Sequence, residues 1–421
     1  MRTKNGRAAM AAVILAAATG PAMGQSAPPR PITIEQAVSE ALDHNLSLLA
    51  ERYNVSVAQA AVVTAGLRPN PVVTVNAMLP DSELVDAGVA TREGAVRTDY
   101  VLERGGKRDR RIEQATLART VAELQLLDTT RKLVLDVQSA FADVQLAKLN
   151  LALAQENLAA LNNVVSVDVE RVRTGDLAQV ELSRSRLAAL QFENDVQQQT
   201  AKLEIARNRL ATLLGRRAGD VPDVTGDLRR DTDVLERDVL QARALEQRPD
   251  VRASRTDQAR SVADLRLQLA NAKIDYTVSG EYHRVQGGGL VGNNYGIFLS
   301  APLPIFNRNQ GEVARAQTEQ QQLEAKTRAL EADVISDLNA AFTDYRAARQ
   351  IVERIESTML AQARDVRTTM EYSYRRGEAS LVEFLDAVRA FNDITRSYNE
   401  ARADYARSLY TLDALSGKVM P

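Results

Sequence analysis

The 421-residue chain contains no cysteine and only two histidines, His44 and His283. Without cysteine, disulfides, thiolate metal sites and acylation of an N-terminal cysteine are excluded. The histidines stand about 240 positions apart with no clustered ligand set, so a zinc or copper site is not expected. The sequence therefore predicts no metal site and no cofactor.

An excess of charge of one sign is also lacking, because 55 acidic side chains nearly balance 53 basic ones. Nucleic acid is therefore not expected as a partner. Long apolar runs are missing except at residues 8–18, which follow three basic residues and precede the small residues of 22–24. This pattern predicts a signal peptide over residues 1–24, with the mature chain beginning at Gln25.

No second apolar stretch approaches the roughly 20 residues that a spanning helix needs. The exported chain is therefore not expected to cross the inner membrane as helices. Its expected locations are the periplasm, the outer membrane and the medium.

The sequence does contain a heptad pattern, and this pattern occurs twice. Its first copy has two apolar lines. One line is Val137, Val144, Leu151, Leu158 and Val165, and the other is Ala140, Ala147, Ala154 and Leu161. Two lines lie 201 positions further on, Leu338, Tyr345, Val352, Met359 and Val366, and Ala341, Ala348 and Ile355. A seam with a period of 3.5 residues is typical of coiled coils, and its repetition indicates an internal duplication.

Each copy of the pattern also contains a glycine turn, at Gly175 and, after a one-residue insertion, at Gly377. The helices after these turns end at Gly215 and Gly417, as glycine C-caps do. Helical hairpins are expected over about 107–214 and 311–416. The first arm, about 68 residues, would be roughly 100 Å long.

A shorter helix is expected to open each repeat, at about 34–66 and 235–271. Alternating polarity then predicts two strands per repeat, at about 71–79 and 96–103, and at about 275–284 and 294–301. The polar links at 80–94 and 285–294 are expected to be loops facing solvent. The predicted organisation is repeat 1 at 25–215, a linker at 216–233, repeat 2 at 234–417 and a tail at 418–421.

Four strands cannot close a barrel, and open edges in lipid would leave backbone polar groups without partners. Two chains would supply eight strands filled by side chains, and three would supply twelve around a lumen. A homotrimer is the simplest channel.

The duplicated order of helix, two strands and hairpin resembles the outer membrane factor (TolC-like) family, as does "YSYRRGEASLVEFLDA" at 372–387. "VLERGGKRDRRIEQA" and "APLPIFNRNQGEVARA" resemble its heavy-metal efflux branch. The resemblance implies a mixed α and β fold, with a trimeric twelve-stranded barrel in outer-membrane lipid above a periplasmic coiled-coil tunnel. It also implies two partners, a periplasmic adaptor and a proton-driven inner-membrane pump of the RND type.

Glu383 and Asp386 lie three residues apart and share one helix face just past the second turn. One interpretation is a solvated face with favourable charge near a helix N-terminus. The resemblance instead places them in the tunnel near its closed periplasmic end, where three copies would form rings of six carboxylates. Such rings would attract cations, and crowding would raise some carboxyl pKa values.

By the same resemblance, Tyr374 of one hairpin meets an acid of the other, Glu181, and helps to hold the tunnel shut. The arginine lock of the family is replaced by Ala379, and Arg375 or Arg376 could substitute for it. Both hairpin tips are expected to dock the adaptor, through Arg173, Thr174, Gly175, Asp176, Arg376, Gly377 and Glu378.

The expected function is therefore an outer-membrane exit duct for a heavy-metal efflux pump. One alternative is a duct for drugs or other small organic compounds. A different class is a soluble periplasmic coiled-coil scaffold or adaptor without a pore. No nucleophile, clustered histidine or pocket motif accompanies the paired acids, so an enzyme is not expected.

Overall fold

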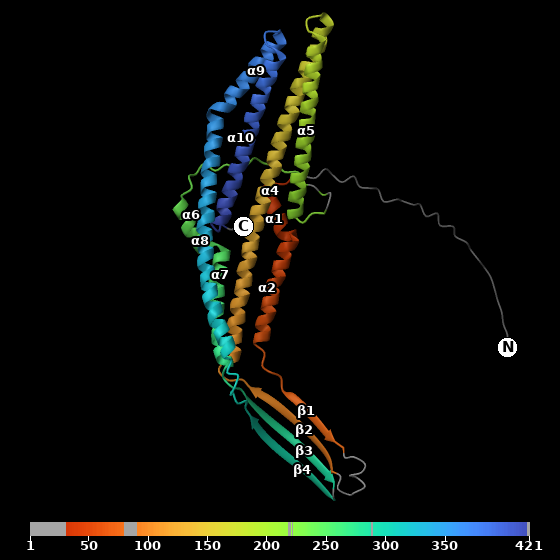
Figure 1. Cartoon of the computed structure of the whole chain (residues 1–421). Helices are drawn as coiled ribbons and strands as arrows, with labels where there is room; N and C mark the ends of the chain where they lie inside the picture. Colours follow the sequence, from red (N-terminus) through yellow and green to blue (C-terminus); the bar gives the residue numbers. More distant parts are fainter. Residues whose placement is uncertain (1–30, 80–90, 218–219, 221, 288, 419–421) are drawn as a thin grey trace, which may run out of the picture.

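The computed structural model describes residues 31–79, 91–217, 220, 222–287 and 289–418 (Figure 1). The expected signal peptide and Gln25 lie outside the described residues, as do most of the link at 80–94 and the last three residues of the tail.

The chain consists of two repeats with the same order of elements. The first comprises α1 (Ile34–His44), α2 (Leu46–Ala65), β1 (Val72–Met78), β2 (Thr91–Leu102), α4 (Lys107–Thr174) and α5 (Gln179–Leu213). The second comprises α6 (Arg237–Gln247), α7 (Pro249–Asn271), β3 (Tyr276–Gly287), β4 (Leu290–Ser300), α8 (Gln310–Arg354), the π-helical turn η1 (Ile355–Met359), α9 (Leu360–Arg376) and α10 (Leu381–Leu415). Figure 1 shows an elongated molecule with the sheet at one end and both hairpin tips at the other.

Each repeat opens with two short helices, where the sequence predicted one. Asn45 interrupts the first pair, because its side chain accepts from the N–H groups of Ser47 and Leu48 and so starts α2. In the second pair Pro249 is the first residue of α7. Both residues are helix-start signals that the prediction of one continuous helix per repeat did not use.

The two interruptions receive the ends of the hairpins. A Cβ at Gly215 would lie 2.5 Å from the carbonyl oxygen of His44, and one at Gly417 would lie 2.9 Å from the nitrogen of Arg248. Both glycines also have positive φ. They are therefore required for close packing as well as for capping.

The four strands form one antiparallel sheet in the order β1-β2-β3-β4. β2 begins at Thr91 rather than at about 96, and β4 begins at Leu290 rather than at about 294. The prediction of a loop over 285–294 was wrong, because Val285 pairs with Gly292 and the reversal is confined to the residues after Gly287. Glycine content suggested a loop there, but strand pairing accommodates these glycines.

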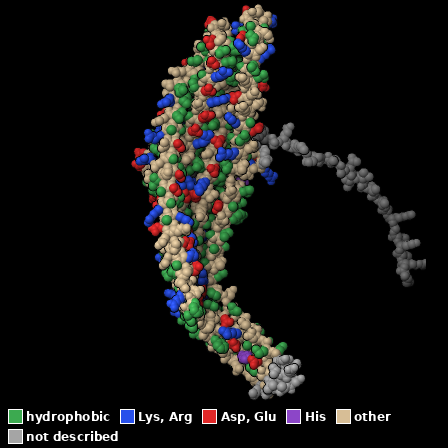
Figure 2. Space-filling model, viewed as in Figure 1, with side chains coloured by type: hydrophobic (Ala, Val, Ile, Leu, Met, Phe, Trp, Pro, Cys, Tyr) green, Lys and Arg blue, Asp and Glu red, His purple; other side chains and the backbone are tan. Residues whose placement is uncertain are grey.

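The sheet has two chemically different faces. Alternation along paired strands puts apolar side chains on one face: Val73, Val75, Val96, Tyr282, Tyr295, Ile297 and Leu299. The other face carries Arg97, whose guanidinium donates to Asp99 (2.8 Å) and to the hydroxyl of Ser279 (3.0 Å). Figure 2 shows blue, red and purple side chains together on the visible face of the sheet.

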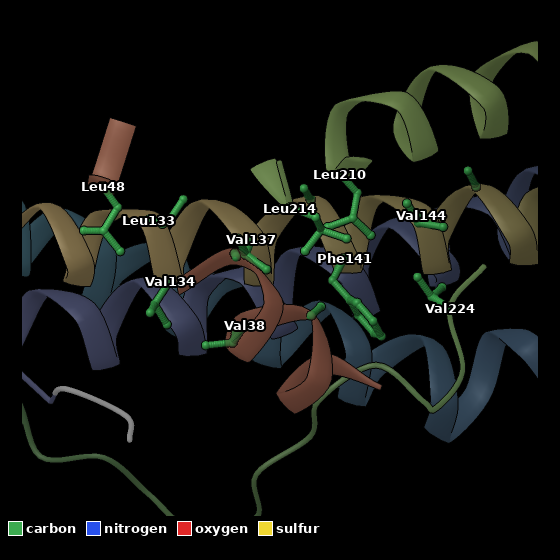
Figure 3. Close-up of a cluster of buried hydrophobic side chains, with 14 of the residues drawn as sticks. Val38, Leu48, Leu133, Val134, Val137, Phe141, Val144, Leu210, Leu214 and Val224 are labelled. Atoms are coloured by element: carbon green, nitrogen blue, oxygen red, sulfur yellow. The ribbon is translucent and has the colours of Figure 1, made fainter. Parts of the chain in front are cut away.

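The predicted heptad seam forms much of the core of the helical part. Along its first line, however, Leu151, Leu158 and Val165 are only half-buried, and the neighbouring Asn157 and Val164 are buried. Val137, Ala140 and Val144 are fully buried in the first repeat, and Leu338 is fully buried in the second. Around α4 the cluster also includes Leu48, Phe141, Leu210, Leu214 and Val224 (Figure 3). These side chains come from α2, from the end of α5 and from the inter-repeat segment, so the seam joins elements that are distant in sequence.

The second seam departs from the prediction after Ile355. Met359 and Val366 were expected to be buried, but they are 39% and 50% exposed. Ala363 is buried instead. The π-helical turn η1 begins at Ile355 and includes Met359, and it changes the phase of the helix by one residue, which explains the error.

Polar pairs link the two hairpins where α4 and α10 lie side by side. Asn157 donates to Asn392 (2.5 Å), Asn399 donates to Asn150 (3.0 Å), and Arg407 donates to Asp143 (2.7 Å). Directional contacts of this kind fix the register of two helices more strictly than apolar contacts do.

Among the residues that the structure describes, none of the helices combines the length and apolar character that crossing a membrane requires.

Candidate channel gate and hairpin tips

Both hairpins reverse at a glycine in the left-handed conformation. Gly175 has φ +85° and Gly377 has φ +78°. The N–H of Asp176 donates to the carbonyl of Arg171 (2.8 Å), and the N–H of Glu378 donates to that of Ser373 (2.9 Å). These bonds satisfy carbonyl groups at the helix ends, and the positive φ explains why glycine occupies both turns.

The first tip is held by contacts within itself. Thr174 donates its hydroxyl proton to Asp176 (2.7 Å), and Arg173 pairs with Glu170 (2.7 Å). A Cβ at Gly175 would meet nothing within 4 Å. This tip is therefore an open surface of the single chain.

The second tip is also exposed, but the first hairpin approaches it at the turn glycine. A Cβ at Gly377 would lie 3.1 Å from the guanidinium of Arg171 on α4. Arg376 lies over the ring of Tyr372, 4.4 Å from its centroid. The two tips have similar turns but different surroundings.

Tyr374 is the contact between the hairpins at this end. Its hydroxyl donates to Oδ1 of Asp168 on α4 (2.8 Å), and Asp168 is completely buried. Its ring stacks on Phe384 with centroids 5.6 Å apart. A tyrosine of the second hairpin thus meets an acid of the first, as the resemblance implied, but within the chain that acid is Asp168.

Glu181, the expected acid, pairs with Arg184 on its own helix (2.7 Å). Its charge still contributes to the electrostatics of Tyr374. Burial and the hydrogen bond to Asp168 are the main causes that raise the pKa of the Tyr374 phenol, with a smaller contribution from Glu181. The phenol is therefore held in its neutral, donating form.

The carboxylate of Asp168 has one satisfied oxygen. Within the described part of the chain, its Oδ2 is buried without a hydrogen-bond partner. The hydrogen bond from Tyr374 therefore stabilises the buried charge of Asp168, because a buried charge without hydrogen bonds is strongly destabilising.

The basic side chain that contacts Tyr374 from the other hairpin is not one of the two proposed as substitutes for the lock. Arg375 pairs with Glu371 (2.6 Å) on its own helix. Arg171 of the other hairpin has its guanidinium 5.9 Å from the Tyr374 ring centroid.

Glu383 and Asp386 lie on the exposed face of α10, as their spacing predicted. The carboxylate of Glu383 accepts from the backbone N–H (2.7 Å) and the hydroxyl (2.8 Å) of Ser380, which completes a capping box. Asp386 lies 3.5 Å from Arg389. In the single chain, each acid interacts with its own helix.

These hydrogen bonds to Ser380 lower the pKa of Glu383. Crowding among carboxylates would instead raise the pKa of Glu383. Such crowding requires three assembled copies, so the ring of six acids remains a prediction.

Sequence reasoning missed Asp168 and Arg171. A signal for Asp168 was present, because this residue continues the heptad line of Ala140, Ala147, Ala154 and Leu161. An acid on an apolar line indicates a buried polar contact. Arg171 gave no comparable signal.

Within the described ranges, no group of three or more His, Cys, Asp or Glu side chains is placed to hold a metal ion.

A sheet with two different faces, joined to tandem helical hairpins that end in a common tip region, defines a subunit of an outer-membrane channel. The chain belongs to the outer membrane efflux protein family, which matches residues 37–216 and 240–418. It is accordingly an efflux channel protein and not an enzyme.

Two relatives match over most of their length. The chain is 24% identical to the cobalt-zinc-cadmium resistance protein CzcC of Cupriavidus metallidurans, covering 92% of this chain and 90% of that protein. It is 23% identical to nodulation protein T of Rhizobium leguminosarum bv. trifolii, covering 91% of this chain and 84% of that protein.

The fold matches that of CusC, whose crystal structures concern folding and transmembrane channel formation. The TM-score is 0.76 at 18% identity, and the match covers 91% of this chain and 92% of that one. The prediction of a TolC-like mixed α and β fold is confirmed.

Proposed function

We propose that three copies of the chain form the outer-membrane exit duct of a tripartite, proton-driven efflux system that exports heavy-metal cations. Each repeat, 25–215 and 234–417, would contribute two strands to the barrel and one hairpin to a periplasmic tunnel. The partners would be a periplasmic adaptor and an inner-membrane pump of the RND type.

The two-faced sheet is the observation that carries this proposal. In the described chain, β1 and β4 each pair with one neighbouring strand only. Three copies joined at these edges would supply twelve strands, with the face of Val75 and Ile297 toward lipid and the face of Arg97 and Asp99 toward a lumen. A soluble scaffold would have no use for an apolar sheet face of this kind.

The length of the helices supports a periplasmic tunnel. The 68 residues of α4 extend over roughly 100 Å. This arm carries the tips away from the sheet, to a place where a partner from the inner membrane could reach them. We propose that Arg173, Thr174, Gly175, Asp176, Arg376, Gly377 and Glu378 dock the adaptor there.

We propose that the second tip closes the duct at rest. The Tyr374–Asp168 bond would hold the hairpins of each chain together, with Glu181 close by. The exposed pair Glu383 and Asp386 would line the opening in three copies and favour cations.

Heavy-metal export is favoured by the name of the CzcC relative, which concerns cobalt, zinc and cadmium resistance, and by acids at the proposed opening. The name of the nodulation protein relative does not concern metals, so a duct for drugs or other small organic compounds stays as the alternative.

One set of measurements tests both levels of this proposal. The protein should be recovered from outer membranes as a trimer by native mass spectrometry, and should conduct in planar bilayers. Loss of the chain in its own host should lower the tolerated concentration of zinc, cobalt or cadmium, with drug tolerance as the comparison. A monomer that does not conduct would contradict the duct, whereas loss of drug tolerance alone would favour the alternative substrate.

A further inference from the structure

The second hairpin has one more residue than the first. Ala154 and Ile355 correspond at a separation of 201 positions, whereas the turn glycines Gly175 and Gly377 are separated by 202. The additional residue therefore lies between Ile355 and Gly377. The structure has a π-helical turn at Ile355–Met359, and such turns are the usual way in which a helix accommodates one inserted residue.

The turn coincides with a change of direction. Figure 1 shows the helix bending between α8 and α9 toward the second tip. In the first hairpin α4 continues without interruption from Lys107 to Thr174. Because π-helical turns widen the helix and weaken its regular hydrogen bonding, they are sites where helices bend.

A side chain of this turn, Glu356, is held both from the segment between the repeats and from the return helix of the same hairpin. Arg230, in the segment between the repeats, donates through both terminal nitrogens to the two carboxylate oxygens of Glu356 (2.8 and 2.9 Å). Tyr398 of α10 donates its hydroxyl to the same carboxylate (2.7 Å). Bidentate pairing of arginine with carboxylate fixes orientation as well as distance.

The segment that supplies Arg230 is itself anchored. The neighbouring Arg229 pairs with Asp413 near the end of α10 (2.7 Å), and the hydroxyl of Tyr405 donates to the carbonyl of Asp231 (2.7 Å). The residue that corresponds to Glu356 in the first hairpin is Gln155, which is exposed. This clamp is therefore a feature of the second hairpin.

We infer that η1 is the hinge of the second hairpin, and that Arg230 and Tyr398, acting on Glu356, fix the resting tilt of α9. The inference rests on the proposed function, in which the second tip closes the duct. Releasing the clamp would let the tip swing and would raise the open fraction of the channel. A swing of about 15° at the end of the 17-residue α9, a lever of about 25 Å, would move the tip by about 6 Å.

Pulsed electron paramagnetic resonance can measure this movement directly, because the natural chain contains no cysteine. Spin labels at Ser166→Cys on α4 and Thr369→Cys on α9 report the distance between the hairpins of one chain. Both sites are exposed. Doubly labelled chain is diluted into unlabelled chain, so that the distances measured lie within one subunit.

The test variants are Glu356→Gln and Arg230→Gln, with Glu353→Gln as the control. Glu353 lies one turn earlier on the helix and pairs with Arg349 of the same helix (2.9 Å). Each test variant should broaden the distance distribution and shift its mean by several ångströms, and the double variant should do no more than either alone. The control should match the natural protein.

Deleting Ser357 tests the hinge itself, because it restores the register of the first hairpin. The distances should then become narrow and insensitive to Arg230→Gln. Should this deletion prevent assembly, the point variants still decide the matter.

Distances unchanged in both point variants, or shifted equally by Glu353→Gln, would overturn the inference. Single-channel recording provides the functional reading, with an open fraction raised by up to about fivefold. Absence of conduction in the natural protein would count against the proposed duct, whereas the distances decide the hinge independently.

Discussion

Tyr374→Phe removes one hydroxyl group and leaves the buried carboxylate of Asp168 without its hydrogen bond. The phenyl ring can still stack on Phe384, so the packing change is small. A hydrogen bond to a charged group contributes about 1.5–3 kcal/mol. Asp168 is completely buried and its other oxygen is already unsatisfied. We therefore expect a loss near the upper end, about 2–3 kcal/mol, in the local stability of the tips.

Hydrogen exchange with mass spectrometry measures this loss where it occurs. A change of 2–3 kcal/mol corresponds to roughly 30- to 150-fold faster exchange, if opening of the tips limits exchange. Peptides covering 161–176 and 370–388 should show the acceleration, and peptides of the sheet should not.

Tyr372→Phe is the matched control, because Tyr372 is 54% exposed and lies two residues from Tyr374. Adding Asp168→Asn to Tyr374→Phe should recover part of the loss, since no buried charge then remains. If exchange in Tyr374→Phe stays within about twofold of the Tyr372→Phe control, the bond does not hold the tips together and the reasoning fails.

Three further predictions concern the same region. Because the folded protein raises the pKa of Tyr374, its contribution to stability should be complete below the unfolded value near 10 and should be lost progressively above it. Exchange at the tips should therefore accelerate, relative to sheet peptides, only as the pH is raised above about 10. Ser380→Ala should destabilise the start of α10 by about 1 kcal/mol. The double variant Glu383→Gln with Asp386→Asn should instead keep the capping box and change mainly the cation selectivity in reversal-potential measurements. Unchanged selectivity would mean that these acids are only a solvated face. Asparagine tolerates positive φ, so Gly175→Asn should leave the trimer intact. It should reduce metal resistance if the adaptor approaches the backbone closely at this turn. Full resistance would refute docking at Gly175.

The parts of the fold that the sequence predicted are those with a local period. The seam through Val137 and Val144 is visible because helical neighbours recur every three to four residues, and both are fully buried. The helix interruptions at Asn45 and Arg248 were missed although local helix-start signals, the Asn45 cap and Pro249, were present. What no local pattern could indicate is that Gly215 and Gly417 pack against them from hairpin ends more than a hundred residues away.

At the candidate gate the same distinction holds. The turn glycines and the exposed acids follow from local pattern, but the acid opposite Tyr374 depends on how α9 lies against α4, which no local rule specifies. Glu383 is the opposite case. "SLVE" at 380–383 is a readable capping box, and the carboxylate has that role in the chain.

The duplication itself explains why a gate would form on one hairpin rather than on both. Two identical hairpins would make the same contacts and prefer the same geometry. Neither hairpin would then be easier to move than the other. The second hairpin differs through one inserted residue, the clamp on Glu356 and the buried bond of Tyr374. The first hairpin contains the uninterrupted helix α4, against which the second hairpin packs. Movement of the second against the first would then break a few specific polar contacts while the heptad core stays packed, which is the condition for reversible opening.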